Sequence, residues 1–332
     1  MKSSAYVIAF IALISIACSQ TGKERPKLGL AMHSFGDASS SAIRKSMETQ
    51  ALDKADLAVI DGLNQQSTQD MQVDSLFEKK IGALAIDPVD AAAIGSLIAK
   101  AKVRKTPVVF FHHMPPVEAM RAWDKLFFVG TRESDAGVAQ GEMVAAYWKA
   151  DPAADRNRDG FLQFIALDGD KGGTAADLLS DGFAKALHAA GMRSERLVSG
   201  NGVEGARART AALVAKYGDR IEAFICGDNA AALGAVEAFK AAGYFKARKR
   251  VPIVGLGEGD ISPAVADAIS SGTLLGAALC DWGNQGRAVF DLAYALAKGS
   301  NPANAGRRIT DAKYIWIPYT KTTNGSGAAS KR

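Results

Sequence analysis

The sequence predicts an α/β fold made of two doubly wound parallel-sheet lobes. Short apolar runs alternate with amphipathic helical stretches from Lys27 onward, and this alternation is typical of right-handed βαβ units around a central parallel sheet. A polar loop containing Pro and Gly, Ala150–Gly160, interrupts the series, and a second series follows it. At about 150 residues per domain, the 332 residues are enough for two lobes with a cleft between them.

The first series has strand runs that are almost entirely apolar, as expected where helices cover both faces of a sheet. In chain order, we expect strands over 27–32, 56–61, 83–86, 107–112 and 127–130, and helices over 40–54, 68–80, 91–102 and 134–149. Each helix follows a strand closely, so these elements form one lobe and lead into the next.

The second series repeats this pattern. We expect strands over 161–167, 194–199, 223–226, 252–256 and 274–279, helices over 174–190, 206–216, 229–242, 263–271 and 285–298, and a late strand over 314–319. Ligands of doubly wound folds bind at the carboxyl ends of the strands, so the informative residues stand just after each strand.

Composition excludes several classes of protein. The chain is 48% hydrophobic and 23% charged, which is ordinary for a globular protein. Its 40 basic and 35 acidic residues give a net charge of +5 without dense Lys/Arg blocks, so we expect no nucleic-acid partner. Cys226 and Cys280 lie in apolar strand runs, which indicates buried thiols and no disulfide framework.

The N-terminus has the features of an export signal. Lys2 precedes an apolar run, Tyr6–Ile16, and small residues surround Cys18. This resembles a bacterial lipoprotein signal, except that Ser15 stands where leucine is usual. The resemblance implies removal of residues 1–17, lipidation of Cys18, a tether over 18–26, and a protein anchored by lipid to a membrane in the periplasm or at the cell surface. The alternative is an ordinary secretory signal with a chance cysteine, and both imply export.

Several strand-end segments together resemble the periplasmic binding proteins of sugar ABC importers, of the galactose/glucose-binding type. The resembling segments run in family order: Leu28–Glu48, Asn64–Lys79, Ala83–Ala92, Pro107–Phe111, Phe128–Thr131, Asp155–Phe164, Gly234–Phe239 and Ile317–Tyr319. The resemblance implies two lobes joined by a three-strand hinge, with the N-terminal lobe at 27–131 and 283–312 and the C-terminal lobe at 132–282 and 313–332. It also implies a solute-binding protein that is not an enzyme and that delivers a monosaccharide, glucose- or galactose-like, to an ABC permease and its ATPase.

The loop that begins at Asp155 has the spacing of an EF-hand calcium loop. Asp155, Asn157, Asp159 and Gln163 supply side-chain oxygens at positions 1, 3, 5 and 9, and the carbonyl of Phe161 is at position 7. Calcium needs six to eight oxygen ligands, but position 12 is an alanine where an EF-hand has a bidentate glutamate. The alternative is a polar turn stabilised by its own side chains.

The resemblance suggests how this loop is completed. Family members that also lack the glutamate take a carboxylate from a distant strand, and the matching residue here is Glu195. We therefore expect a structural calcium ion in the second lobe.

The ligand pocket keeps only part of the family pattern. By resemblance, Asp37 and Asp260 match aspartates that bind hydroxyl groups, and Asp87 and Asp228 stand at asparagine positions. A buried hydroxyl without a partner costs about 1–3 kcal/mol, so a sugar pocket needs such acceptors.

The family's other sugar contacts are replaced in this chain. The two sandwiching aromatic rings fall on Ser39 and Glu204, so the ligand is either a hexose in a rebuilt pocket or another small polar molecule. The strand-end substitutes are His33, Phe35, His112, His113 and Trp282. Phe35 and Trp282 are the candidate stacking rings, although lobe packing explains them equally well. His112 and His113 alternate in direction if their strand continues, so at most one, taken as His112, should face the cleft.

Two other functions compete with transport. A sensor that presents its closed form to a chemoreceptor has the same sequence features. An exported nucleotide-using enzyme has weak support from Gly255–Gly259, but the glycine spacing is not that of a dinucleotide fingerprint, and Glu258 and Asp260 would repel a pyrophosphate.

Overall fold

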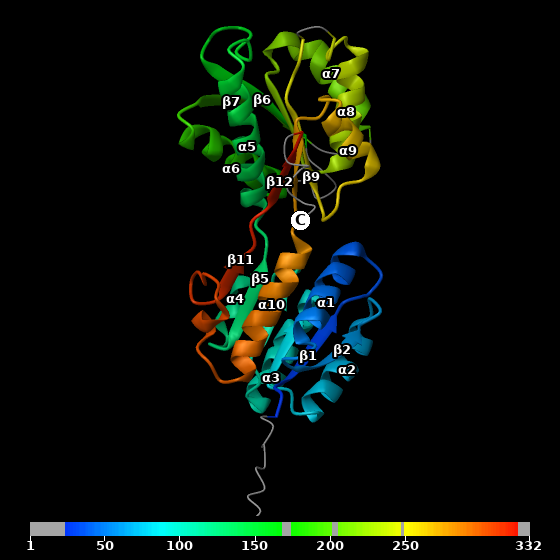
Figure 1. The fold of residues 1–332 in the computed structure, drawn as a ribbon, viewed down its shortest axis with the longest axis vertical. Helices are drawn as coiled ribbons and strands as arrows, with labels where there is room; N and C mark the ends of the chain where they lie inside the picture. Colours follow the sequence, from blue (N-terminus) through cyan, green and yellow to red (C-terminus); the bar gives the residue numbers. More distant parts are fainter. Residues whose placement is uncertain (1–23, 168–173, 201–204, 247–248, 325–332) are drawn as a thin grey trace, which may run out of the picture.

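The computed structural model describes residues 24–167, 174–200, 205–246 and 249–324, which form two α/β lobes (Figure 1). The predicted signal peptide, Cys18 and Glu204 lie outside the described residues. No helix among the described residues is long and apolar enough to cross a membrane.

The first lobe contains a six-stranded parallel sheet in the order β11-β5-β4-β3-β1-β2. Its strands are β1 (Lys27–Met32), β2 (Asp56–Asp61), β3 (Ala83–Ile86), β4 (Val108–Phe111), β5 (Leu126–Gly130) and β11 (Tyr314–Trp316). Its helices are α1 (Ala38–Ala51), α2 (Gln66–Glu78), α3 (Ile94–Arg104), α4 (Val117–Arg121) and α10 (Trp282–Ala297), with short 3-10 turns at Ala91–Ala93 and Pro302–Ala305.

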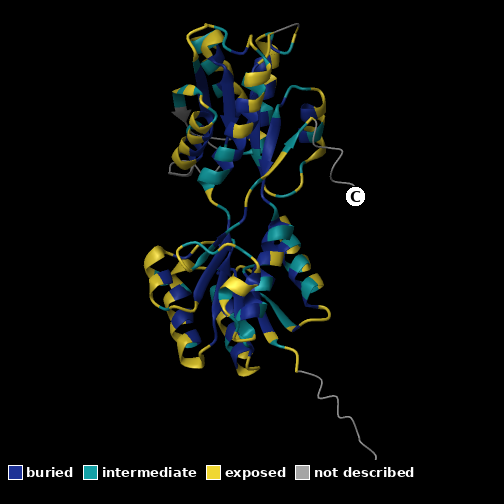
Figure 2. Cartoon of the chain, turned by 60° about the vertical axis from the view of Figure 1, so that its left-hand side comes forward, coloured by how far each residue is buried: buried dark blue, intermediate teal, exposed yellow. Residues whose placement is uncertain are grey.

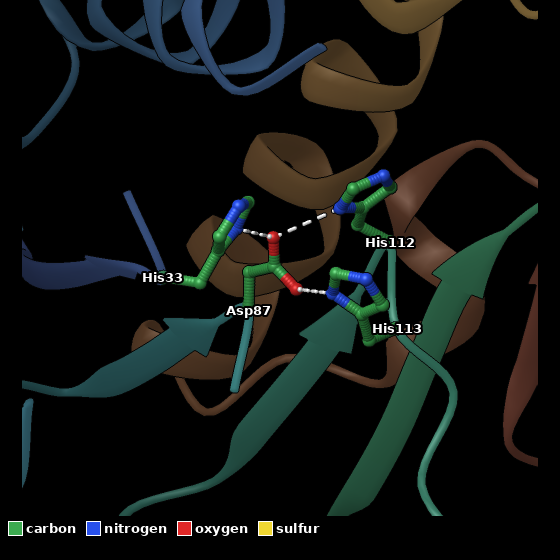
Figure 3. A group of neighbouring side chains, drawn as sticks. All are labelled: His33, Asp87, His112 and His113. Carbon is green, nitrogen blue, oxygen red and sulfur yellow. Dashed lines mark hydrogen bonds and ion pairs between the residues drawn. The ribbon is translucent and has the colours of Figure 1, made fainter. Parts of the chain in front are cut away.

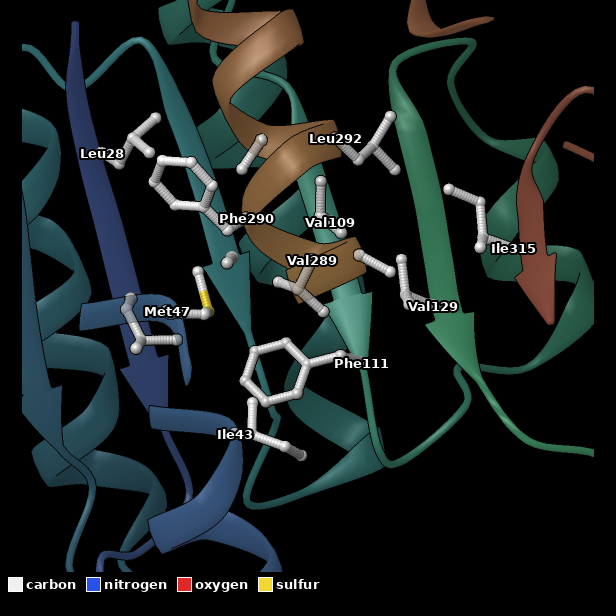
Figure 4. Packing of buried hydrophobic residues seen from close by; sticks show 14 of the residues in the cluster. Leu28, Ile43, Met47, Val109, Phe111, Val129, Val289, Phe290, Leu292 and Ile315 are labelled. Carbon is white, nitrogen blue, oxygen red and sulfur yellow. The ribbon is translucent and has the colours of Figure 1, made fainter. Parts of the chain in front are cut away.

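Apolar side chains cover both faces of this sheet. Leu28 and Leu30 of β1 point to the face covered by α1 and α10, while Ala31 points to the face covered by α2 and α3. Figure 4 shows the first of these layers, in which Val289 and Phe290 of α10 pack over the sheet. The strands are therefore almost entirely apolar, as predicted.

The second lobe contains a sheet in the order β12-β10-β9-β8-β6-β7, in which only β12 is antiparallel. Its strands are β6 (Phe161–Leu167), β7 (Arg193–Gly200), β8 (Ala223–Cys226), β9 (Ile253–Gly257), β10 (Gly276–Leu279) and β12 (Thr320–Thr323). Its helices are α5 (Glu133–Ala150), α6 (Thr174–Ala189), α7 (Ala206–Tyr217), α8 (Asn229–Ala241) and α9 (Pro263–Ser270), with a 3-10 turn at Gly218–Arg220.

Helices α5 and α6 pack with their backbones in close approach. A Cβ atom at Gly137 would lie 1.9 Å from the carbonyl oxygen of Leu179, and one at Gly182 would lie 2.0 Å from that of Ser134. Only glycine fits at these two positions, since real Cβ atoms do not come within 3.0 Å of backbone.

The chain passes between the lobes three times, after β5, after β10 and after β11, so the predicted fold class with its three-strand hinge is confirmed. Figure 2 shows the chain running between the two lobes in narrow segments. The predicted late strand at 314–319 ends early, at Trp316, and a separate strand in the other lobe, β12, begins at Thr320; Pro318, which has no N–H to donate, lies between them. The first lobe therefore reaches Trp316, beyond the expected boundary at 312.

Candidate functional site

The candidate site is a cavity of about 690 Å³ at the hinge, where the carboxyl ends of strands from both sheets face each other. It is lined by His112, His113, Met114, Phe128, Thr131, Arg132, Glu133, Ser134, Leu178, Glu258, Cys280, Trp282, Trp316 and Tyr319. A second cavity of about 320 Å³ on the second lobe shares Glu258, Cys280 and Tyr319 with it and adds Asp228 and Asn229. The combined cleft is large enough for a small ligand.

A cluster of three histidines around one aspartate forms the first-lobe edge of this cleft (Figure 3). The Nδ1 atoms of His33 and His112 lie 2.6 and 3.0 Å from Oδ2 of Asp87, and Nδ1 of His113 lies 2.7 Å from its Oδ1. These residues follow β1, β3 and β4, which are neighbours in the sheet with β3 in the middle. The sheet order therefore places the fully buried Asp87 between the histidines.

The expectation that at most one of His112 and His113 faces the cleft is wrong, because both line the cavity. The strand ends at Phe111, and His112 has a φ of 61°, in the left-handed region. The N–H of His113 then donates to the carbonyl of Phe111 at 2.7 Å, which closes a three-residue turn. This turn removes the alternation of the strand and brings both rings to the same carboxylate.

The imidazoles control the charge of the cluster. Burial alone would raise the pKa of Asp87, but the hydrogen bonds from His112, His113 and His33 hold it well below its usual range. The hydrogen bond to Asp87 raises the pKa of His33. Gln69 supports the cluster from beneath, since its Nε2 donates to the carbonyl of Asp87 at 2.9 Å.

Asp37 caps helix α1 at the edge of the cluster. Its carboxylate accepts hydrogen bonds from the N–H of Ser40 and from the hydroxyls of Ser39 and Ser40, and it lies 3.1 Å from Nε2 of His33. Burial alone would raise the pKa of Asp37, but these hydrogen bonds lower it to about 2. Both oxygens of Asp37 therefore already have partners in the protein.

Aromatic rings gather at the hinge side of the cleft. Trp282 begins α10, meets the ring of His112 edge-on at 5.4 Å and lines the cavity, as expected for a stacking ring. Phe35, the other candidate, instead lies under the guanidinium of Arg44 at 4.4 Å and is not among the cavity-lining residues. Trp316 and Tyr319 line the cavity although the sequence analysis did not select them. The one sequence feature that could have indicated them is their position on either side of the last segment that crosses between the lobes.

The second lobe presents polar groups of a different kind. Asp228 caps α8 through Oδ1, which accepts from the N–H of Ala231 at 2.6 Å. The other oxygen, Oδ2, and Oδ1 of Asn229 are buried without a hydrogen-bond partner, and both residues line the smaller cavity. Asp260 is exposed in the turn after β9 and lines neither cavity.

The loop with calcium-binding spacing lies at the amino end of β6, away from the cleft, and its side chains form hydrogen bonds within the loop. Asp159 accepts from the N–H of Phe161 at 2.8 Å and from Nε2 of Gln163 at 2.6 Å, and Asn157 donates to Gln163 at 3.0 Å. Oδ1 of Asp155 is buried without a hydrogen-bond partner, which fits a group that awaits a cation.

The carboxylate that approaches this loop is Glu222 rather than the expected Glu195. Glu222 precedes β8, is buried, and accepts from the N–H groups of Arg156 at 2.7 Å and Gln163 at 3.2 Å. Glu195 on β7 is half-exposed and lies 3.7 Å from Arg220. Strands β7 and β8 both flank β6, so strand position alone could not separate the two glutamates.

Two lobes joined by three crossovers, with a polar and aromatic cavity at the hinge, define a ligand-binding protein that closes around its ligand. Residues 28–301 match the model of the periplasmic binding protein domain. The chain belongs to the periplasmic binding protein family and is a binding protein, not an enzyme.

Relatives of the chain include proteins named for sugar binding. The chain is 35% identical to the D-galactose/methyl-galactoside binding periplasmic protein MglB of Haemophilus influenzae, over 96% of both chains. It is 26% identical to the D-ribose/D-allose-binding protein of Pseudomonas aeruginosa, over 82% of both. Among solved structures, the periplasmic ribose ABC transporter protein of Conexibacter woesei has a TM-score of 0.66 at 18% identity, covering 91% of this chain and 93% of its own.

Proposed function

We propose that the protein captures a monosaccharide or a closely related polyol in the hinge cavity and delivers it to an ABC permease. The observation that carries this proposal is the hinge cavity itself, which is lined by Trp282, Trp316 and Tyr319 together with Glu258, and which adjoins Asp228 in the smaller cavity. Such rings contact the apolar faces of a sugar, and carboxylate or amide oxygens accept from its hydroxyls. The names of the relatives support the same ligand class.

The polar groups of the second lobe are consistent with a ligand that reaches them when the two lobes close. The free oxygens of Asp228 and Asn229 are costly to bury unless a donor reaches them, and sugar hydroxyls are donors. Galactose and glucose are the first candidates because of the likeness to the galactose-binding relative. The ribose/allose-binding relative makes ribose and allose the next to test.

A thermal-shift and calorimetric screen of these sugars tests the proposal. A ligand present at 100 times its Kd stabilises the native state by about 2.7 kcal/mol, which is readily measured. We expect one sugar to raise the melting temperature and to make the protein more compact in small-angle scattering. If no sugar or polyol raises the melting temperature, the proposed function is wrong.

We further propose a structural calcium ion in the loop from Asp155 to Gln163. The buried free oxygen of Asp155 and the neighbouring carboxylates of Asp159 and Glu222 supply hard oxygen ligands. Calcium should therefore raise the melting temperature of the wild type, and Asp155→Ala should abolish that rise. Glu195→Gln is the matched control and should keep it; loss of the calcium response in Glu195→Gln would restore Glu195 as the ligand.

Export and anchoring complete the proposal. Cleavage before Cys18 followed by its lipidation would hold the protein at the membrane beside the permease, and Cys18→Ala should release it into the soluble fraction. Incorporation of labelled palmitate into Cys18→Ala would contradict the anchor. A deletion strain separates transport from chemoreceptor sensing, because only loss of a transporter abolishes uptake of the sugar.

A further inference from the structure

The cluster at the first-lobe edge of the cleft has the composition of a transition-metal site. His33, Asp87, His112 and His113 each offer one ligand atom, and these atoms all lie within 4.8 Å of one another. Ligand atoms about 2.1 Å from a tetrahedral zinc ion lie about 3.4 Å from one another, so shifts of about 1 Å complete the set. Three imidazoles and one carboxylate are typical zinc ligands.

We propose that this cluster binds one divalent transition-metal ion of the zinc class, at the floor of the hinge cavity. The three imidazole rings crowd around one carboxylate, with ring centres 4.3–5.8 Å apart. A divalent ion binds the neutral rings and the carboxylate together, and so satisfies all four groups at once.

The backbone supplies a second, independent observation. His112 adopts the left-handed conformation, which is uncommon for a residue with a side chain, and the tight turn there serves to bring two successive imidazoles to the same point. Gln69 fixes the backbone of Asp87 from below and accepts from the N–H of Val89 at 3.1 Å. These contacts hold the ligands in place before a metal binds, as hydrogen bonds to the ligands do in other metal sites.

The donor atoms distinguish this site from the calcium loop. Imidazole nitrogens favour zinc, cobalt, nickel or copper, whereas calcium and magnesium prefer oxygen. The two sites also lie on different lobes, so one can be removed without the other.

The ion would face the ligand. His112 and His113 line the hinge cavity, and the side chain of His113 is 57% exposed, so a metal can enter from the cleft. The cluster supplies four ligands, so a hydroxyl or carboxylate oxygen of the bound molecule would be a fifth ligand of an ion that expands its coordination. This step rests on the proposed function, and it offers a replacement for the hydroxyl-binding contacts that the chain lacks.

Titration of the untagged protein with zinc chloride tests the site. The wild type should bind one zinc ion per chain at the cluster, and His113→Gln and His33→Gln should weaken binding at least tenfold. His188→Gln, which changes the exposed histidine of α6, is the matched control and should bind as the wild type does. Cobalt(II) in place of zinc should give the intense visible absorption of a four-coordinate ion, lost in His113→Gln. Unchanged zinc affinity in His113→Gln, with folding verified by circular dichroism, would overturn the site.

Sugar titrations of metal-free and zinc-loaded protein, both with calcium restored, separate the two proposals. Tighter sugar binding in the zinc-loaded form supports the inference in full. Sugar binding without any zinc binding overturns the metal site and leaves the proposed function intact. Zinc binding without a response to any sugar overturns the proposed function and leaves the metal site standing.

Discussion

The two lobes present opposite kinds of polar edge to the same cleft. In the first lobe, Asp37 and Asp87 already accept hydrogen bonds from serines and histidines, so the edge is ordered before any ligand arrives. In the second lobe, Asp228 and Asn229 each keep a buried oxygen without a partner. The difference indicates that the first lobe provides a preformed surface, and that the second provides groups completed only when the ligand is held.

The second lobe is held together by packing between its helices and strands, away from the cleft, rather than by hydrogen bonds between the polar groups that face the cleft. Its helices α5 and α6 touch at Gly137 and Gly182, and the buried side chain of Gln140 donates to the carbonyls of Cys226 and Gly255 at 2.9 and 3.0 Å. Gln140 therefore fixes the end of β8 and the middle of β9 from the helix side. Variants that act on one lobe at a time test this contrast.

Gly137→Ala should have the largest effect, since its methyl group would collide with the backbone of α6. We expect a loss of at least about 3 kcal/mol in the free energy of unfolding, measured by urea denaturation. Gly95→Ala is the control, because a Cβ there meets nothing within 4 Å and alanine favours the helix. Equal stability of the two variants would show that α5 and α6 can separate without cost.

Asp87→Ala should be the most damaging change at the first-lobe edge. It removes a buried acceptor shared by three imidazoles, and we expect a loss of about 2–3 kcal/mol in urea denaturation. Asp87→Asn keeps the shape and one acceptor and should lose less. A loss for Asp87→Ala no greater than that for Asp228→Ala would mean that the first-lobe edge is no better ordered than the second.

The two helix-capping aspartates should differ in ligand binding. Asparagine caps helices about as well as aspartate, so Asp37→Asn and Asp228→Asn should both retain stability. Asp228→Asn should weaken sugar binding about tenfold, or 1.4 kcal/mol, by calorimetry, since Oδ2 is free for the ligand. Asp37→Asn should have a smaller effect. If Asp37→Asn weakened sugar binding more than Asp228→Asn, Asp37 would be the principal contact, as the sequence predicted.

A substitution of Asp291 should have the smallest effect on stability, and it should raise stability where the other changes lower it. Burial raises the pKa of this half-buried carboxyl on α10, and nearby Arg307 only partly opposes it. With the folded pKa above the unfolded one, stability falls as pH rises between the two. Asp291→Asn should therefore raise the melting temperature slightly at pH 7 and not below pH 3.8. A lower melting temperature at pH 7 would show that the ionised form is favoured.

Much of the fold could be predicted because apolar strands and amphipathic helices repeat along the chain. The strand-end rule also selected His112, Asp228 and Trp282, which line the two cavities. It selected Asp87 too, which is fully buried behind His112 and lines neither cavity. It could not give the sheet order that places β3 between β1 and β4, nor the left-handed turn at His112, since both are set by tertiary structure.

Two further residues were missed for related reasons. Trp316 appeared to lie inside one continuous strand, whereas the chain crosses between lobes just after it. Glu222 follows a 3-10 turn and contacts the calcium loop from the side of β8. Glu195 is also a glutamate, and it lies on β7, at the other side of β6.

The three crossovers have a consequence for how the chain matures. Helix α10 and strand β11 complete the core and the sheet of the first lobe, yet both come after the whole parallel part of the second lobe in the chain. A chain emerging N-terminus first can therefore assemble most of the second lobe before the first has all its parts. The early strands β1 to β5 then wait with one face covered by α1 alone until α10 is in place.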